Sequence, residues 1–256
     1  MDEQKNKEIE LFTFPSSPFG WKVACYLEYK NLNYKFIGVS PITFKQVSFT
    51  KRKQVPVLSI NGEWKLESSD IGIWLDEIFP QKGILGETTE EKKLILSIDS
   101  WISNQLIPAL FRITVDWPSI RAGLNNGWKL AAAVHKATPM PFWVRLLWPI
   151  FIKNAGFINR MVDRLDRSMS LKLFQRKIIE DFKAHLAGGP FLGGMKQISL
   201  ADLSAYPIVV LPYRLGFQGD APWLSHKDVL NWVKEVEKHL PENPFLVDPN
   251  SLKPFK

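Results

Sequence analysis

A proline-centred turn followed by a helix start is the feature that most constrains how this chain folds. The turn is Gln54-Val-Pro-Val-Leu58, and Glu67-Ser-Ser-Asp70 begins eleven residues after its proline. A proline between strand-forming residues cannot donate a ladder hydrogen bond, which is typical of a cis turn at a sheet edge. Ser68 stands where a helix should begin, and the unpaired N–H groups of that first turn can hold a carboxylate. Together the two features predict a surface that holds a peptide.

The segments around this turn predict a small sheet with helices, in the order β-α-β-(α)-β-β-α. Ser17 is placed to cap the first helix and Pro18 to open it, and a helix between two strands makes those strands parallel. Asn61-Gly62 is the signal for a hairpin between the last two strands. The expected elements are strands 9–13 and 34–39, a helix from Pro18 to about Lys30, a short helix or irregular connection at 42–50, strands 55–60 and 63–66, and a helix from Ser68 to Ile78. This order is that of a thioredoxin-like domain.

The rest of the chain predicts an all-helical second domain. Pro80 ends the preceding helix and glycines interrupt the segment after it, so we expect domains at 8–80 and 89–250, joined by a linker at 81–88. Ser199-Leu-Ala-Asp202 is a capping box at the start of a late helix. The expected helices are a long one from Thr89 and others near 142–158, 160–187, 199–216 and 226–239.

Composition narrows the class of protein further. The 256 residues are enough for two modest domains, and a single cysteine excludes an internal disulfide framework, a redox pair and a cysteine-rich zinc site. That usage fits a reducing, cytoplasmic compartment, and Met1 to Glu8 carry charges without the apolar core of a secretory signal. The net charge of +7 favours anionic ligands or lipid over nucleic acid, because no nucleic-acid-binding motif or long basic helix is present.

Four motifs, in order, resemble those of the glutathione transferase superfamily over nearly the whole chain. The first, Phe14-Pro-Ser-Ser-Pro-Phe-Gly20, is similar to the active-site start of tau-class enzymes, and the second, the turn 54–58, is similar to the family's cis-proline turn. The third, Glu67-Ser68, matches the family's γ-glutamyl-binding pair. The fourth, Phe191-Leu-Gly-Gly194 followed by Ser199-Leu-Ala-Asp202, resembles its late capping motif. The late motifs are also similar to those of the membrane-associated prostaglandin E synthase of glutaredoxin-like type, whose start carries two cysteines. Here those positions are Ser17 and Gly20, which disfavours dithiol chemistry and thiol transfer.

The resemblance implies an α/β thioredoxin-like domain followed by an all-α domain, with glutathione as co-substrate and no metal. It assigns the glutathione-binding set Ser17, Lys53, Gln54, Val55, Glu67 and Ser68. Val55 pairs through its backbone with the cysteinyl part of glutathione, as an added strand does, and Glu67-Ser68 holds the γ-glutamyl ammonium and carboxylate. Gln54 stands where many relatives have lysine, so the glycyl carboxylate is expected to draw on Lys53 or Lys51.

Ser17 takes the position that faces the glutathione thiol. A thiolate is the useful nucleophile, and a hydroxyl hydrogen bond at the positive end of a helix favours it, so Ser17 stabilises the thiolate and is not itself a nucleophile. The alternatives are that Ser17 is only a helix cap, or that Ser16 makes the contact. Cys25 is expected to be a buried, inert thiol. The histidines at 135, 185, 226 and 239 show no paired metal spacing.

A second-substrate pocket for a small apolar electrophile should be lined by apolar residues. Each candidate is more often a core residue than a pocket wall, and the sequence does not name the electrophile. The candidates are Phe14, Phe19, Trp21, Phe111, Trp117 and Tyr213.

Residues 140–158 form an aromatic run that is unusual for the superfamily. The run is long enough to span a membrane, but Arg145, Pro149 and Lys153 argue against a span. Three interpretations stay open, which are burial in the core, a homodimer face, and peripheral contact with a membrane. The surrounding region, 118–176, is enlarged for this superfamily, which bears on the usual dimer interface.

We therefore expect a cytoplasmic glutathione transferase, of the kind that serves detoxification, which joins the glutathione thiolate to a small apolar electrophile. The alternative is a non-catalytic protein of the same fold that binds an apolar ligand, a partner or a membrane surface through its helical domain. An isomerase or dehalogenase that uses the same bound thiolate is a third hypothesis. The Ser17 start and Glu67-Ser68 favour the first hypothesis, and Gln54 and the aromatic run favour the second.

Overall fold

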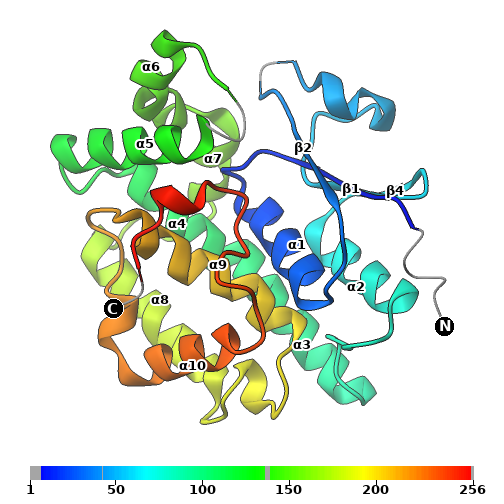
Figure 1. Cartoon of the computed structure of the whole chain (residues 1–256). Coiled ribbons are helices and arrows are strands. Elements are labelled where there is room, and N and C mark those ends of the chain that lie inside the picture. The colour runs from blue at the N-terminus through cyan, green and yellow to red at the C-terminus, as the bar shows by residue number, and fades with distance from the viewer. Residues whose placement is uncertain (1–6, 42, 136–138, 255–256) are drawn as a thin grey trace.

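A four-stranded mixed sheet organises the first part of the molecule (Figure 1). The computed structural model describes residues 7–41, 43–135 and 139–254. The strand order is β2-β1-β3-β4, with β2 parallel to β1 and the other neighbouring pairs antiparallel. The strands are β1 (Ile9–Thr13), β2 (Lys35–Gly38), β3 (Val57–Ile60) and β4 (Glu63–Lys65). The predicted strand order along the chain and the predicted strand directions of a thioredoxin-like domain are confirmed.

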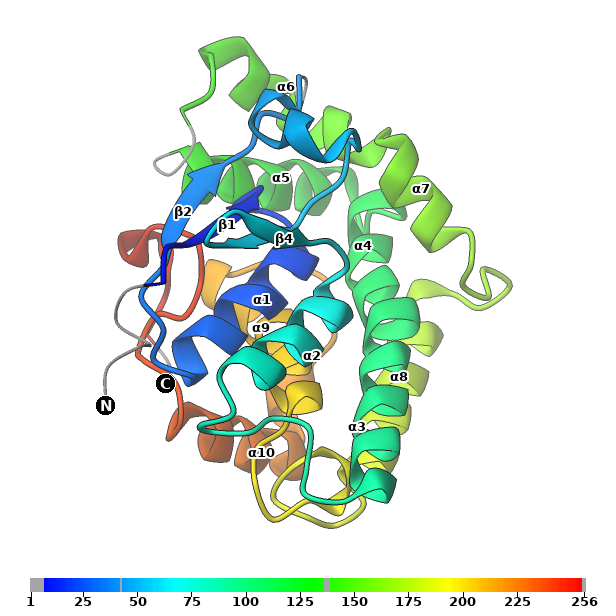
Figure 2. The ribbon, with the colours of Figure 1, turned by 90° about the vertical axis from the view of Figure 1, so that its right-hand side faces the viewer.

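Alternation along the strands divides their apolar side chains between the two faces of the sheet. Helices α1 (Pro18–Tyr29) and α2 (Ser68–Ile78) cover one face, and the 3-10 helix η1 (Lys45–Thr50) lies in the connection after β2 (Figure 2). Leu11 and Leu58, which pair across β1 and β3, join the main core. The next pair, Phe12 and Val57, turns to the other face and forms a small cluster with Val47 of η1.

The chain after residue 88 is helical, as predicted. Its helices are α3 (Thr89–Trp101), the π-helical turn η2 (Ile102–Leu106), α4 (Ile107–Val115), α5 (Ile120–His135), α6 (Phe142–Lys153), α7 (Gly156–Val162), α8 (Leu171–Leu186), α9 (Leu200–Leu215) and α10 (Lys227–Glu237). The helix expected at 142–158 is divided between α6 and α7. The helix expected at 160–187 is also divided, because its first residues belong to α7 and α8 begins only at Leu171. Ser170 explains the second break, because its Oγ accepts the Leu173 N–H as a helix cap. The domain boundaries at 80 and 89 stay a prediction.

The segments α3, η2 and α4 form one long continuous helix from Thr89 to Val115 (Figure 2). By length and composition this is the one helix among the described residues that could cross a membrane. Half of its most apolar window is buried inside the protein, which is the pattern of a core helix.

Helix α9 lies at the centre of the core, and every one of its residues except Tyr213 is buried. The predicted capping box is present, because Asp202 accepts hydrogen bonds from the Ser199 N–H at 2.9 Å and its Oγ at 2.8 Å. Asp202 also accepts from the Leu192 N–H and from Trp232 Nε1, both at 2.8 Å. Burial raises the pKa of this carboxyl to about 6 in spite of those donors.

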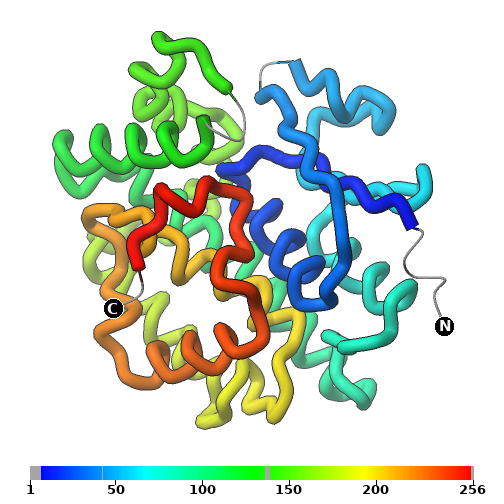
Figure 3. The backbone as a smooth tube through the Cα atoms, in the orientation of Figure 1, coloured from blue at the N-terminus to red at the C-terminus, as the bar shows by residue number. Residues whose placement is uncertain are grey.

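The C-terminal segment returns across α9 (Figure 3). Buried Arg214 donates from Nη1 to the Glu242 carbonyl at 2.9 Å and from Nε to the Lys253 carbonyl at 3.1 Å. The Lys253 N–H donates back to the Arg214 carbonyl at 2.8 Å. One arginine therefore fastens the tail to the core helix.

A buried ion pair joins the sheet domain to the helical region. Nζ of Lys22 on α1 lies 2.8 Å from Oδ1 of Asp99 on α3, and the two side chains are 0% and 1% exposed. Asp99 also accepts from Ser69 Oγ on α2 and from Ser204 Oγ on α9, the latter at 2.6 Å. Because Ser204 donates its proton to the carboxylate, Tyr26 must donate its own hydroxyl to Ser204, 2.6 Å away. Four helices thus meet at one carboxylate.

We predict that Asp99→Asn lowers the free energy of unfolding by about 3–5 kcal/mol, because it leaves the Lys22 ammonium buried without a counter-charge. The double variant Lys22→Met/Asp99→Asn should lose less than the sum of the two single variants. Urea denaturation measures each value. Asp163→Asn is the control, because that carboxylate is 61% exposed in its pair with Arg167, and it should change stability by less than about 0.5 kcal/mol. Equal losses for Asp99→Asn and the control would contradict the prediction.

Candidate functional site

Three loops meet at one end of the sheet (Figure 2). Phe12 at the end of β1 pairs with Val57 at the start of β3, so the loop after β1 lies beside the turn before β3. Lys65 at the end of β4 pairs with Leu58, which brings the start of α2 to the same end. The three loops hold the residues that the motifs assign to glutathione.

Ser17 begins α1 as a helix cap, as predicted. Its Oγ accepts the Gly20 N–H at 3.3 Å, and its own N–H donates to the Phe14 carbonyl at 3.0 Å. The Ser17 side chain is 9% exposed, and Ser16 beside it is half-buried. A hydroxyl that accepts one hydrogen bond can still donate its proton, so the cap is compatible with a contact to a thiol. The thiol contact itself stays a prediction.

Packing fixes the loop that leads into α1. Trp21 Nε1 donates to the Pro15 carbonyl at 2.6 Å. Gly20 lies so close to Thr13 that a Cβ at position 20 would be 2.3 Å from Thr13 Oγ1. A cysteine at position 20 would therefore require the Thr13 side chain to move, which agrees with the absence of a dithiol pair in the sequence.

The predicted cis peptide bond is present between Val55 and Pro56. Val55 lies outside the strands, and neither its N–H nor its C=O is hydrogen-bonded to any other described residue. An unpaired stretch of backbone at a sheet edge can take up an added peptide strand. The turn thus offers the pairing groups that the cysteinyl part of a tripeptide would need.

Glu67 carries an uncommon backbone conformation at the start of α2. Its φ is 61°, in the left-handed half of conformational space, which costs a residue with a Cβ about 1–2 kcal/mol. The helix after it has no side-chain cap hydrogen bond, so first-turn N–H groups are open beside buried Ser68. Strain of this kind is concentrated at binding and catalytic sites, which makes the start of α2 a candidate site independently of any motif.

Gln54 and Glu67 connect the proline turn to this helix start. Gln54 Nε2 donates to Glu67 Oε1 at 2.5 Å, and the Glu67 carboxylate is exposed. Lys51 and Lys53 are both exposed just before the turn, and neither forms an ion pair in the described part of the chain. Both lysines remain available to an anionic ligand.

The first-domain candidates for a second-substrate pocket differ in exposure. Trp21 is buried in the main core, so its ring offers almost no surface to a ligand. Phe14 is half-buried and packs edge-on against Phe44 with ring centroids 5.5 Å apart. Phe19 is also half-buried, at the border of the main core.

The helical-region candidates make contacts of their own. Phe111 on α4 packs edge-on against Phe157 of α7, with centroids 6.2 Å apart. Trp117 lies under Lys153, whose Nζ is 4.2 Å from the ring centroid. Tyr213 is exposed on α9. Among the described residues no aromatic ring contact joins these three to Phe14 or Phe19, and the pocket stays a prediction.

Two further features bear on the chemistry that the site can support. Cys25 is fully buried, and burial, assisted by the nearby Glu28 carboxylate, raises the pKa of its thiol well above the usual value. Within the described residues no group of three or more His, Cys, Asp and Glu side chains is arranged to hold a metal ion. A cavity of about 500 Å³ lies between α8 and α10, lined by residues such as Lys183 and Asp228, and it includes none of the predicted site residues.

The sequence analysis missed the buried network behind the site. Ser69, which follows the predicted contact Ser68, donates to Asp99 and so links the site to the ion pair with Lys22. A signal for it exists in the sequence, because Asp99 lies on the same helical stripe as Ile95 and Ile102, where a charged residue is out of place unless it is paired.

A thioredoxin-like domain followed by a helical region, with a cis-proline turn and an uncapped helix start at one sheet end, is the glutathione transferase architecture. Residues 11–83 match the family model described as the glutathione S-transferase N-terminal domain. The first domain therefore resembles the N-terminal domain of that family, and the whole chain has the fold of solved glutathione transferases. The predicted resemblance is confirmed at this level.

Comparison with individual proteins gives low sequence identity. A glutathione S-transferase from Rhodospirillum rubrum superposes with a TM-score of 0.59 at 16% identity, over 95% of this chain and 97% of that chain. Poplar glutathione transferase F1 gives 0.59 at 17% identity, over 90% of this chain and 92% of the other. Prostaglandin E synthase 2 from Danio rerio is 27% identical over 70 residues, which are 27% of this chain and only 19% of that protein.

We predict that Glu67→Gly is about 1 kcal/mol more stable than Glu67→Ala, because glycine adopts a positive φ without the steric cost that alanine keeps. Glu63 on strand β4 is the matched control, since it lies four residues before Glu67 and has an ordinary φ. There the order should reverse, with alanine more stable than glycine by about 0.5–1 kcal/mol. Urea denaturation of the four variants measures both differences, and the same order at both positions would contradict the assignment of strain to Glu67.

Proposed function

We propose that the chain binds glutathione at the end of the sheet and joins its thiolate to a small apolar electrophile. The observation that supports this most directly is that the start of α1, the cis-proline turn and the strained start of α2 come together at one sheet end. Each loop supplies one kind of group that the tripeptide requires. The fold, shared with glutathione transferases, is consistent with the proposal and does not establish the reaction.

In this proposal, each part of glutathione meets its own partner. The γ-glutamyl carboxylate lies at the open N–H groups beside Ser68, where the helix dipole adds positive potential, and its ammonium pairs with Glu67. The cysteinyl backbone pairs with Val55, and Lys53 with Gln54 serves the glycyl carboxylate. The sulfur then points toward Ser17 at the N-terminus of α1.

We predict that Glu67→Ala weakens glutathione binding by a factor of about 10–100, because it removes the carboxylate of a charge-assisted contact worth roughly 1.5–3 kcal/mol. Isothermal titration calorimetry with reduced glutathione measures the affinity. Glu63→Ala removes an exposed carboxylate from the neighbouring strand and should leave it unchanged. Equal affinity of Glu67→Ala and the parent protein would remove Glu67 from the site.

Ser17 is proposed to lower the pKa of the bound glutathione thiol. We predict that Ser17→Ala raises that pKa by about one to two units and slows conjugation at neutral pH, with little change in glutathione affinity. An ultraviolet thiolate titration of both proteins with glutathione bound measures the shift. Ser16→Ala is the control. Because Ser17→Ala also loses the cap of α1, worth about 1 kcal/mol, unfolding curves measure the stability of each variant separately. A pKa shift in Ser16→Ala alone would transfer the role to Ser16.

The electrophile is proposed to bind between the two domains, against the exposed parts of Phe14, Phe19, Trp117 and Tyr213, while buried Phe111 would support this surface from within. Trp21 would support the loop before α1 and would not line the pocket, because it is buried and donates to the Pro15 carbonyl. A cytoplasmic location, a role in detoxification and a homodimer belong to the same proposal.

The second candidate function is a non-catalytic protein of this fold that binds a ligand, a partner or a membrane surface. The bond between Gln54 and Glu67 favours it, because glutathione would have to compete with Gln54 for the same carboxylate. Glutathione binding without conjugation of any electrophile would support this candidate over the first.

A further inference from the structure

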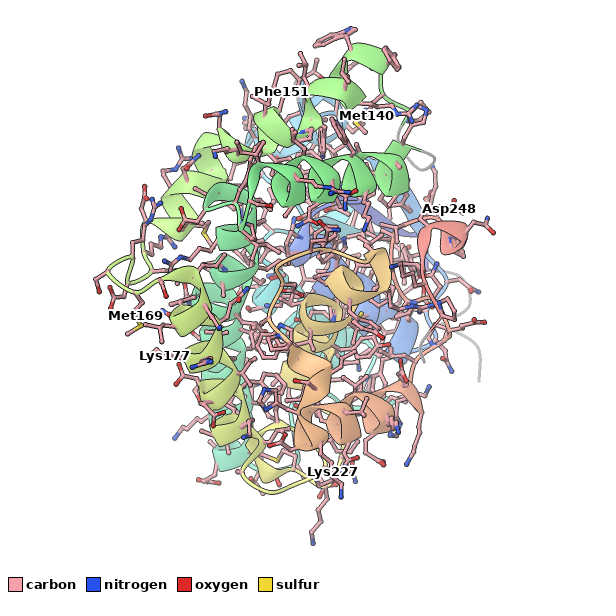
Figure 4. The ribbon with its side chains drawn as sticks, turned by 90° about the vertical axis from the view of Figure 1, so that its left-hand side faces the viewer. Met140, Phe151, Met169, Lys177, Lys227 and Asp248 are labelled. Carbon is pink, nitrogen blue, oxygen red and sulfur yellow. The ribbon has the colours of Figure 1, made fainter. Side chains whose placement is uncertain are left out.

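Helix α6 lies at one end of the molecule (Figures 1 and 4), and it presents an apolar face to solvent. The residues of this α6 apolar face are between 39% and 76% exposed, and they are Phe142, Trp143, Leu146, Leu147, Ile150 and Phe151. Their spacing is that of one helix side, and at about 3.6 residues per turn they cover roughly half of the circumference. Trp143 and Phe151 also contact each other edge-on, with ring centroids 6.4 Å apart.

The opposite side of α6 is packed against α5, so this helix is docked in the fold with its apolar face outward. Val144 and Pro149 are buried. Gly127 on α5 allows the close approach, since a Cβ there would be 2.6 Å from the ring of Pro149. Trp128 Nε1 donates to the Leu146 carbonyl at 3.0 Å, which fixes the helix from the side.

The charge around this helix has one sign. Residues 117–162 contain no aspartate or glutamate, and their cationic residues are Arg121, Lys129, Lys136, Arg145, Lys153 and Arg160. The nearest carboxylates along the chain, Asp116 and Asp163, both pair with Arg167. In the described part of the chain Arg121, Arg145 and Arg160 form no ion pair. An anionic surface would therefore meet these three arginines without competition from any carboxylate of residues 117–162.

We propose that the α6 apolar face docks in the plane of an anionic lipid bilayer. Aromatic and aliphatic side chains on one side of a helix, with cationic residues and no carboxylates nearby, are the combination that binds the interface of anionic membranes. The helix has 12 residues, so at about 1.5 Å per residue it is too short to span a hydrocarbon core of about 30 Å. A second copy of the chain is a poorer occupant, because pairing these faces would bring two carboxylate-free cationic regions together.

Flotation of the full chain with lipid vesicles tests the proposal. With vesicles of phosphatidylcholine containing about 30% phosphatidylglycerol, the parent protein should float, and Phe142→Ser/Trp143→Ser should lower the bound fraction at least about tenfold. Binding should also fall several-fold in pure phosphatidylcholine and as salt is raised. Leu94→Ser/Leu173→Ser is the matched control, because it removes two exposed leucines from other helices, and it should float like the parent.

Three results would overturn the proposal. They are no flotation of the parent protein, equal flotation of the Phe142→Ser/Trp143→Ser variant, or a parent dimer in analytical ultracentrifugation that this variant dissociates without any vesicle binding. Thermal unfolding followed by circular dichroism tests whether both double variants fold. Glutathione titration of the same samples keeps the outcome separate from the proposed function, since neither double variant touches the sheet end.

Discussion

The buried ion pair between Lys22 and Asp99 is the interaction on which the arrangement of the two parts of the chain depends. Each charge has lost its water, so neither helix can shift without leaving the other charge unpaired in the interior, which costs several kcal/mol. The pair sits directly behind the candidate site, because Ser69 donates to Asp99 and its neighbour Ser68 is a proposed glutathione contact. Burial, together with the charge of the same carboxylate, raises the pKa of Tyr26 and keeps its hydroxyl a donor within the network. Fold stability and the position of the helix start are therefore set by one group.

The sheet domain could be predicted from sequence because local rules determine it. A serine cap followed by proline, as at Ser17 and Pro18, is a local signal for a helix start, and Asn61-Gly62 supplies the two positive φ angles that the hairpin turn requires. The boundary between α6 and α7 could not be predicted in the same way, because no side-chain cap marks the start of α7. The start of α8 does carry a local signal, the Ser170 cap, which the apolar pattern around it obscured. Helix α5 was likewise not predicted.

The candidate site also contains residues that local motifs predict and residues that only the packing determines. Its proposed glutathione contacts follow from short motifs whose backbone geometry is local, and the structure places their three loops together. The second-substrate residues could not be assigned from sequence, because the exposure of an aromatic ring depends on what packs over it. Trp21 illustrates this, since a hydrogen bond to Pro15 holds it inward although it lies only four residues after Ser17. The positive φ of Glu67 is also invisible in the sequence, and it is a conformational sign of a site that no residue type reveals.

Helices α9 and α6 show why apolar content alone does not distinguish a core helix from a docking helix. Both are rich in aliphatic and aromatic residues and both contain proline. Around α9 the core closes on every side, and its one carboxylate, Asp202, is fully hydrogen-bonded, which is how a buried polar group is tolerated. Around α6 only one side is covered, and Arg121, Arg145 and Arg160 form no ion pair in the described part of the chain. An apolar face with no binding role is normally covered by the protein's own fold. The α6 apolar face is exposed beside arginines that form no ion pair, which supports an anionic membrane as the surface that covers it.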